Sequence, residues 1–233
     1  GVFFLHYFLT TGFMVFPFLF RDVGISDGDH SIYYLGILFM SILLMSPFIW
    51  LSDQKGRSRL VMQWMVVMLL IAMLGLVEGT GSTALLLFMV VFFVGFNLLE
   101  MLLPAHMSRV VAAGTRGTGM GVYSTFQFMG TFAGGVIGGF VLSFGDISTV
   151  LYVNAGVCLI WLLLLFRLQS LSEIESRTVD LRSDKELPAN EVLEGLLSIH
   201  GVLDAVLIEE ECVAYLKIDS NKFNEADIQQ FTQ

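Results

Sequence analysis

The sequence L-S-D-Q-K-G-R-S-R, residues 51–59, decides the fold of this chain. This short basic segment joins two apolar runs, Ser31–Leu51 and Leu60–Val77. Each run is about as long as the roughly 20 residues that cross the core of a bilayer. Short loops rich in Lys and Arg stay on the cytoplasmic side of a membrane. The segment therefore predicts a hairpin of two membrane-spanning helices whose turn faces the cytoplasm.

The composition places the chain among integral membrane proteins. Of its 233 residues, 55% are hydrophobic and 14% are charged, and the mean hydropathy is +0.77. A soluble domain of this size could not bury so much apolar surface. The apolar runs are continuous rather than alternating, which predicts helices and excludes a β-barrel. Four further runs complete a predicted set of six spans: Val2–Phe20, Thr83–Leu103, Met120–Phe144 and Ile147–Phe166. The first is interpreted as a true span and not as a signal peptide, in a chain whose front is missing.

The charges predict both the orientation of the spans and a domain boundary. Residues 1–171 hold seven acids and seven bases, whereas residues 172–233 hold the remaining 14 acids and 5 bases, the whole net charge of −9. With the basic loop inside, six bases of the first part lie inside and one, Arg21, lies outside. The inside bases are Lys55, Arg57, Arg59, Arg109, Arg116 and Arg167. We therefore predict a membrane domain over 1–171 and an acidic cytoplasmic domain over 172–233.

The acidic tail changes from apolar runs to mixed periodicity. A short β-like stretch, Thr178–Leu181, precedes a helical stripe over Asn190–Ile199. Val202–Ile208 and Cys212–Ile218 are rich in β-branched residues and predict a hairpin, and Asn224–Phe231 predicts a second helix. The order β-α-β-β-α predicts a small ferredoxin-like α+β domain of the split βαβ type. We expect Leu193, Leu196 and Leu197 to pack on strand residues Val206, Ile208, Val213 and Tyr215.

Six helices with a basic loop between the second and the third resemble one half of a major facilitator superfamily transporter. The loop resembles the cytoplasmic motif G-x-L-a-D-R-x-G-R-R of that family, which Leu51, Asp53, Gly56 and Arg57 match. Ile49, Gln54 and Ser58 depart from it, which is typical of the copy in the second half. The resemblance implies helices seven to twelve of a twelve-helix protein, so the expected fold is an all-α six-helix transmembrane bundle with the ferredoxin-like tail.

Two other features add to this resemblance. The glycines of the fifth run are spaced like the antiporter signature G-x8-G-x3-G-P-x2-G-G of the same superfamily: Gly121, Gly130, Gly134, Gly135 (at the place of the proline), Gly138 and Gly139. Small residues allow helices to approach closely, so we predict helix packing for these glycines, with substrate contact as the alternative. The segment Gly201–Asp219 resembles the hairpin in the C-terminal domain of YajR-type transporters.

Four polar residues within the spans are candidates for a transport path or gate: Asn97, Glu100, Gln127 and His6. Glu100 is the single acid inside a span, where a charge is costly and needs a cavity or a partner. It is interpreted either as a protonation site or as half of an ion pair with Arg57 or Arg109. His6 is expected to face lipid or to snorkel in preference to relaying protons. Gln127 is expected either to line a central cavity or to make a hydrogen bond between helices.

The resemblance implies secondary active transport, by proton-coupled efflux of a small organic solute through alternating access of two bundles. The expected partners are that solute, membrane lipid and an N-terminal six-helix half, with self-association through the tail and no nucleic acid. The sequence contains no pattern for catalysis, a metal or a cofactor, and Cys212 lacks the second cysteine of a C-x-x-C metal loop. The energy source implied is a proton gradient across a bacterial inner membrane. The alternative function is a membrane-anchored regulatory module in which the helices are only a scaffold.

Overall fold

The computed structural model of the chain describes residues 1–54, 57–78, 81–111, 115–167, 174–180, 189–208, 213–219, 222–224 and 227–228. It divides into two compact units, one formed by Gly1–Ala105 and Gly121–Gln169, and the other by His106–Met120 and Ser170–Gln233. The boundary that the charges predict, after residue 171, lies outside the described residues.

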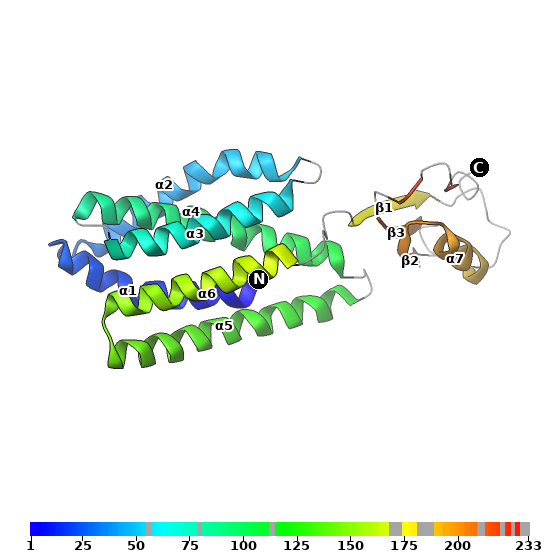
Figure 1. Cartoon of the computed structure of the whole chain (residues 1–233). Coiled ribbons are helices and arrows are strands. Elements are labelled where there is room, and N and C mark those ends of the chain that lie inside the picture. The colour runs from blue at the N-terminus through cyan, green and yellow to red at the C-terminus, as the bar shows by residue number, and fades with distance from the viewer. Residues whose placement is uncertain are drawn as a thin grey trace. The chain divides into compact units, whose positions relative to one another are not determined.

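Six long helices contain the six predicted spans. They are α1 (Val2–Asp22), α2 (His30–Ser52), α3 (Ser58–Glu78), α4 (Ser82–Val110), α5 (Arg116–Phe144) and α6 (Ile147–Arg167), and Figure 1 shows them running alongside one another. Each is long and apolar enough to cross a membrane. The largest departures from the predicted bounds are at α4 and α5, which continue beyond their apolar runs to Val110 and back to Arg116. Hydropathy marks only the part of a helix that lies in lipid, so it misses polar turns that continue the same backbone.

The core of the six helices comes mainly from α1, α3, α4 and α6. Its largest fully buried side chains include Phe8, Phe16, Phe92 and Trp161. Helices α2 and α5, by contrast, leave most of their apolar side chains exposed, as Leu35 of α2 (67%) and Phe132 of α5 (73%) show. An apolar side chain exposed on a membrane helix must contact lipid or another membrane protein, so α2 and α5 have faces that this bundle does not cover.

Helix α5 packs on α1 through three glycines spaced four residues apart. Gly130, Gly134 and Gly138 are buried. A Cβ atom added to Gly130 would collide with the carbonyl group of Phe3, and one added to Gly134 would lie 2.6 Å from the carbonyl oxygen of Tyr7. Such contacts bring the two helix backbones together, as small residues allow.

The other three glycines of the series lie elsewhere on α5. A Cβ atom on Gly121 or Gly139 would have no neighbour within 4 Å, and one on Gly135 would meet only the methyl group of Thr10 at 3.9 Å. The series therefore divides into a half that contacts α1 and a half that does not.

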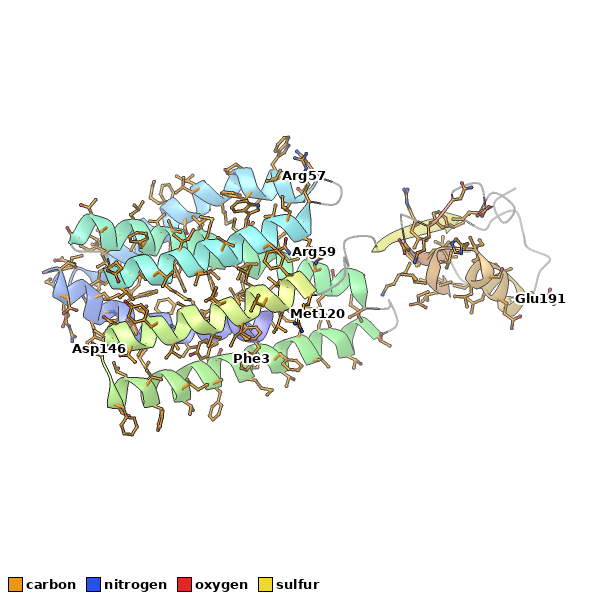
Figure 2. All side chains as sticks on the ribbon, in the orientation of Figure 1. Phe3, Arg57, Arg59, Met120, Asp146 and Glu191 are labelled. Carbon is orange, nitrogen blue, oxygen red and sulfur yellow. The ribbon has the colours of Figure 1, made fainter. Side chains whose placement is uncertain are left out.

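Opposite charges lie at opposite ends of the helices. Figure 2 shows Arg57 and Arg59 at one end of the bundle and Asp146, between α5 and α6, at the other. Arg59 also connects two helices: its Nη2 donates to the carbonyl oxygens of Leu165 (3.2 Å) and Phe166 (3.4 Å), which belong to the last turn of α6. Carbonyl groups in the last turn of a helix lack partners within the helix, and a basic side chain satisfies them.

The described part of the tail is a three-stranded antiparallel sheet with one helix, and it confirms the predicted α+β class. Strands β1 (Ile174–Asp180), β2 (Val202–Ile208) and β3 (Val213–Asp219) have the order β1-β3-β2, and α7 (Ala189–Ser198) lies between β1 and β2 in the chain. This is the strand order of a split βαβ unit. The predicted helix Asn224–Phe231 lies largely outside the described residues.

The prediction of which strand residues face the tail's core is wrong. The buried residues of the hairpin are Ala205, Ala214, Leu216 and Ile218, whereas Tyr215 is 37% exposed. From α7, Val192, Leu196 and Ile199 enter this core, but Leu197 is 45% exposed. Both faces of the hairpin carry apolar residues, so alternation did not distinguish the inner face from the outer. A shift by one residue reverses every side chain of a strand.

Candidate functional site

A buried histidine, His6, lies where α1, α4 and α5 meet. Only 6% of the residue is exposed, so the expectation that it faces lipid or snorkels is wrong. Its Nε2 lies 2.7 Å from Nε2 of Gln127 on α5 and 3.7 Å from Oε2 of Glu100 on α4. Three of the four predicted path residues thus form one cluster, made of side chains from three helices. We call His6, Glu100 and Gln127 the polar cluster.

The contacts of the imidazole define its neutral tautomer. Nδ1 of His6 lies 3.2 Å from the carbonyl oxygen of Val2, one turn earlier in α1. A carbonyl oxygen only accepts, so Nδ1 carries the hydrogen and donates it. Nε2 then has a free lone pair, which accepts a hydrogen bond from the amide N–H of Gln127. This answers the question that the sequence left open for Gln127, because the side chain makes a hydrogen bond between helices.

Glu100 presents one carboxylate oxygen to this imidazole. Its Oε2 is buried and, among the described residues, has no hydrogen-bond partner, yet the side chain as a whole is 38% exposed. The predicted ion pair with Arg57 is wrong, because the basic group beside this carboxylate is His6. The side chain of Arg109 lies outside the described part of the chain. Glu100 therefore combines a buried oxygen next to a titratable ring with partial access to the surroundings.

A tyrosine with no predicted role lies beside the cluster. Tyr123 precedes Gln127 by one turn of α5, is 9% exposed, and has a buried hydroxyl group without a hydrogen-bond partner in the described part of the chain. Residues four apart lie on the same face of a helix. A buried hydroxyl group without a partner is costly, so the Tyr123 hydroxyl has hydrogen-bonding capacity that the described residues do not use. Its signal in the sequence was only its spacing from Gln127.

Asn97, the fourth predicted path residue, lies one turn from Glu100 but contacts a different helix. Its Nδ2 donates to Oγ of Ser41 on α2 at 2.9 Å, and that hydroxyl donates to the carbonyl oxygen of Leu38 at 2.8 Å. A comparable pair joins α6 and α1, where Nδ2 of Asn154 donates to Oγ1 of Thr11 at 2.8 Å. The interior of the bundle is therefore polar at several points and not uniformly apolar.

The loop motif lies at the end of the bundle where α2 turns into α3. Asp53 follows the last residue of α2 and is exposed, and no basic side chain pairs with it in the part of the chain that the structure describes. Arg57 is exposed as well, Leu51 is half-buried, and Gly56 lies outside the described residues. Asp53 and Arg57 therefore present charge at the surface of the bundle.

Six apolar helices, a basic loop at one end and a polar cluster in the interior define an integral membrane helix bundle with a partly polar interior. The family comparison agrees: the model of the Major Facilitator Superfamily matches residues 1–208, and the chain belongs to this superfamily. A second model, the YajR YAM domain, matches residues 185–233. The resemblance that the sequence motifs carried is thereby confirmed.

Curated relatives are transporters that are longer than this chain. The chain is 32% identical to the inner membrane transport protein YajR of Escherichia coli (strain K12), over 99% of its own length and 51% of that protein. It is 33% identical to an uncharacterized transporter of Buchnera aphidicola subsp. Acyrthosiphon pisum, over 58% of the chain and 35% of the relative. The chain spans about half the length of the first of these relatives. A second Buchnera transporter is 29% identical to it, over 69% of the chain and 42% of that relative.

Proposed function

We propose that this chain is the second six-helix half of a secondary active transporter of the bacterial inner membrane. In this proposal the exposed faces of α2 and α5 meet a first half, and the two bundles alternate access to a central cavity. The first half supplies six more helices and the intact copy of the loop motif. The tail is a cytoplasmic domain, because it follows α6 in the chain and α6 ends on the side of the basic loops. Its proposed role is regulation or self-association.

The proposed reaction is proton-coupled efflux of a small organic solute. The polar cluster carries the proposal: a buried imidazole lies between an amide at 2.7 Å and a partly exposed carboxylate at 3.7 Å. A second proton on Nε2 of His6 has an acceptor in Glu100. The amide N–H of Gln127 would then face an N–H donor, so the amide must rotate and accept through its oxygen instead. Protonation thus changes the contact that joins α1 to α5.

Coupling of proton binding to transport requires a contact between helices that changes when a proton binds, and the contact of His6 with Gln127 is of this kind. A proton shifts a conformational equilibrium only if it binds one state more tightly than the other. The contact of His6 with Gln127 differs between the two protonation states, and any movement of α5 relative to α1 changes it further. The energy source proposed is therefore the proton gradient, without a cofactor and without enzymatic chemistry.

The scaffold alternative requires an apolar interior that does nothing beyond anchoring the tail. Against it stand the buried polar residues His6, Thr11, Ser41 and Asn154. Polar groups inside membrane helices are costly and tend to serve ion or substrate paths. The transporter proposal accounts for the polar cluster, whereas the scaffold leaves it without a role.

The test uses the intact transporter that contains this half, reconstituted in proteoliposomes with a pH-sensitive dye inside. Solutes are screened for one that moves protons across the membrane. We expect Glu100→Gln and His6→Gln to abolish solute-driven proton movement. The matched control is Glu78→Gln, a carboxylate at the other end of the bundle that accepts from Tyr152 at 3.1 Å, and it should leave proton movement unchanged. Full coupling in Glu100→Gln would remove the polar cluster from the mechanism.

A further inference from the structure

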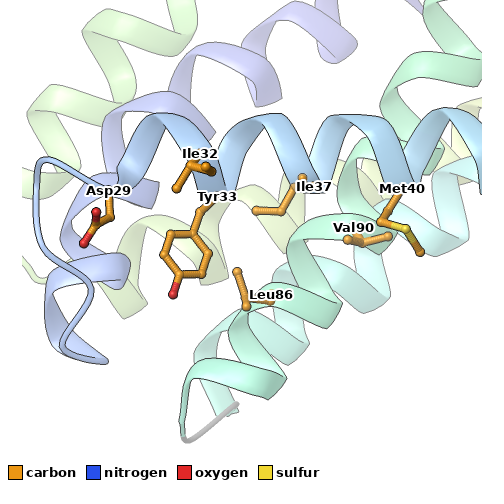
Figure 3. A pocket seen from close by; sticks show the side chains of 8 residues that line it. Asp29, Ile32, Tyr33, Ile37, Met40, Leu86 and Val90 are labelled. Carbon is orange, nitrogen blue, oxygen red and sulfur yellow. The ribbon is translucent and has the colours of Figure 1, made fainter.

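An apolar groove runs between α2 and α4, away from the polar cluster and near the end of the bundle opposite the basic loop. Its volume is about 500 Å³. Figure 3 shows Asp29 at the start of α2, with Tyr33, Ile37 and Met40 following along that helix and Leu86 and Val90 facing them from α4. Every one of these residues except Asp29 and Tyr33 presents only apolar atoms from its side chain.

The carboxylate at the end of this groove is not neutralised by a neighbour. Asp29 is exposed, and its Oδ2 accepts a hydrogen bond of 2.9 Å from Oγ of Ser26. No basic side chain pairs with it among the described residues. The nearby Asp27 differs, because Arg21 binds it through two nitrogens at 2.6 and 2.9 Å. The negative charge of Asp29 therefore remains unpaired, within the described part of the chain, at one end of the apolar groove.

The surrounding charges reinforce this charge. The segments at this end carry five acids, Asp22, Asp27, Asp29, Glu78 and Asp146, against one base, Arg21. An excess of one sign around a site with low-dielectric walls raises the local concentration of ions of the opposite sign. The end of the bundle that holds the groove therefore attracts cations.

The dimensions of the groove suit an extended molecule. Asp29 and Met40 are 11 positions apart, which corresponds to roughly 16 Å along a helix. A ligand with several hydroxyl groups would find only the Tyr33 phenol and the Asp29 carboxylate as partners, and its other polar groups would be left unsatisfied. A molecule with one positive charge and an apolar body satisfies both ends of the groove.

We propose that this groove is a binding subsite for an amphipathic organic cation, with the charged group at Asp29 and the apolar body between α2 and α4. The inference rests on the proposed transport function and names the class of solute that it moves. A bilayer lipid with an amine headgroup has similar chemistry, and the test separates it from a solute.

Gly36 gives a direct way to close the groove. It lines the groove, and a Cβ atom on it would have no neighbour within 4 Å, so a larger side chain enters open space. Gly36→Leu therefore places an apolar side chain in the groove from a Cβ position that has no close neighbour. Gly139→Leu is the matched control, because Gly139 also has open space around its Cβ position but lies on α5, outside the groove.

The experiment measures binding of a dansyl-labelled alkyltrimethylammonium to the full chain in dodecyl maltoside micelles, which contain no amine headgroup, with empty micelles as background. The anionic comparison is the dansyl-labelled alkylsulfonate of the same chain length. We expect the cation to bind more tightly than the sulfonate, Asp29→Asn to weaken the cation about tenfold, and Gly36→Leu to abolish binding. Gly139→Leu should bind as the unaltered chain does, and Asp22→Asn, which removes an acid outside the groove, should weaken the cation clearly less than Asp29→Asn does.

Three results would overturn the assignment: equal binding of cation and sulfonate, equal losses in Asp29→Asn and Asp22→Asn, or unchanged binding in Gly36→Leu. Displacement of the probe by phosphatidylethanolamine added to the micelles would make the groove a lipid site instead. The proposed function is judged separately. If the groove fails while Glu100→Gln still abolishes solute-driven proton movement in the intact transporter, transport stands and only the solute class is wrong.

Discussion

The backbone of Gly134 lies so close to Tyr7 that a methyl group on the glycine would come within 2.6 Å of the Tyr7 carbonyl oxygen. Backbone atoms cannot move aside as the end of a flexible side chain can. Gly134→Ala should therefore push α5 away from α1 and destabilise the bundle by about 1–3 kcal/mol. Thermal unfolding of the full chain in detergent measures this loss.

The control for Gly134 is Gly139→Ala on the same helix. Open space surrounds its Cβ position, and alanine favours a helix over glycine by about 1 kcal/mol. This variant should be as stable as the original chain or more stable. Equal destabilisation by the two variants would show that the contact with α1 is not what makes Gly134 sensitive.

The hydrogen bond between His6 and Gln127 should contribute to stability as well as to coupling. Gln127→Leu leaves Nε2 of the buried imidazole without the donor that lies 2.7 Å away, and the expected cost is about 1–3 kcal/mol. A double-mutant cycle with His6→Phe in the full chain isolates the pairwise contribution. We expect a coupling energy of at least about 0.5 kcal/mol, as is found for residues in contact.

The corresponding control is Thr131→Ala, one turn beyond Gln127. The hydroxyl group of Thr131 is exposed and donates to the carbonyl oxygen of Gln127 within the same helix, so its loss should cost little. Additive effects of His6→Phe and Gln127→Leu would contradict a specific contact.

Asp53 should act on the other half of the transporter. It is exposed at the end of α2 and has no basic partner in the described part of the chain. A helix N-terminus carries partial positive charge and free N–H groups, so a helix of the first half is its expected partner. By the same reasoning, the start of α5 near Arg116 and Thr118 should receive the corresponding Asp of the first half.

Asp53→Asn in the intact transporter should lower the transport rate without lowering expression, whereas Asp53→Glu should retain more activity. Wild-type transport by Asp53→Asn would exclude Asp53 from the mechanism.

Asp146 should make the stability of the bundle depend on pH. Its Oδ1 accepts hydrogen bonds from the hydroxyl group (2.7 Å) and the backbone N–H (2.8 Å) of Thr149, at the start of α6. The hydroxyl bond, followed by the backbone bond, holds the pKa of Asp146 below its ordinary value of 3.8. Since the folded state has the lower pKa, the stabilisation is complete above the unfolded-state pKa and is lost as the pH falls through the folded-state value.

Thermal midpoints of the full chain and of Asp146→Asn, compared between neutral and acid pH, test this sign. The difference between the two proteins should be largest near neutrality and should disappear in acid, where the aspartate is protonated and resembles asparagine. A difference that stays constant with pH would show that the carboxylate charge does not contribute.

The tail should fold by itself as a soluble domain. Residues 172–233 form about the smallest unit that buries a sufficient core, so the fragment should be folded but only marginally stable. Leu216, 1% exposed on the inner face of β3, should be essential, and Leu216→Ala should cost about 2–5 kcal/mol. Its neighbour Tyr215, on the other face, should tolerate replacement by alanine much better. Circular dichroism of the two variants separates them, and a disordered spectrum for the unaltered fragment would contradict an independent domain.

The sequence by itself determined the six spans and the β-α-β-β order of the described part of the tail. Hydropathy and turn chemistry are local properties: a continuous apolar run of about 20 residues has to become a helix, because lipid offers its backbone no other partners. The signal for a strand is local as well, so the bounds of β2, Val202–Ile208, could be predicted from β-branched residues between turn signals. The motif around Asp53 and the spacing of the glycines are also local patterns, and they indicated the family.

Only the tertiary structure decided which polar residues meet. His6 and Gln127 are 121 positions apart, and nothing in either helix specifies how far each is rotated about its axis, because an apolar span lacks the polar face that orients a soluble helix. Close packing of Gly130, Gly134 and Gly138 on α1 fixes that rotation and brings Gln127 to the histidine. The hairpin of the tail has the same ambiguity. Val206 and Leu207 are both apolar, so only the packing of α7 on the sheet determines which of its two faces is buried.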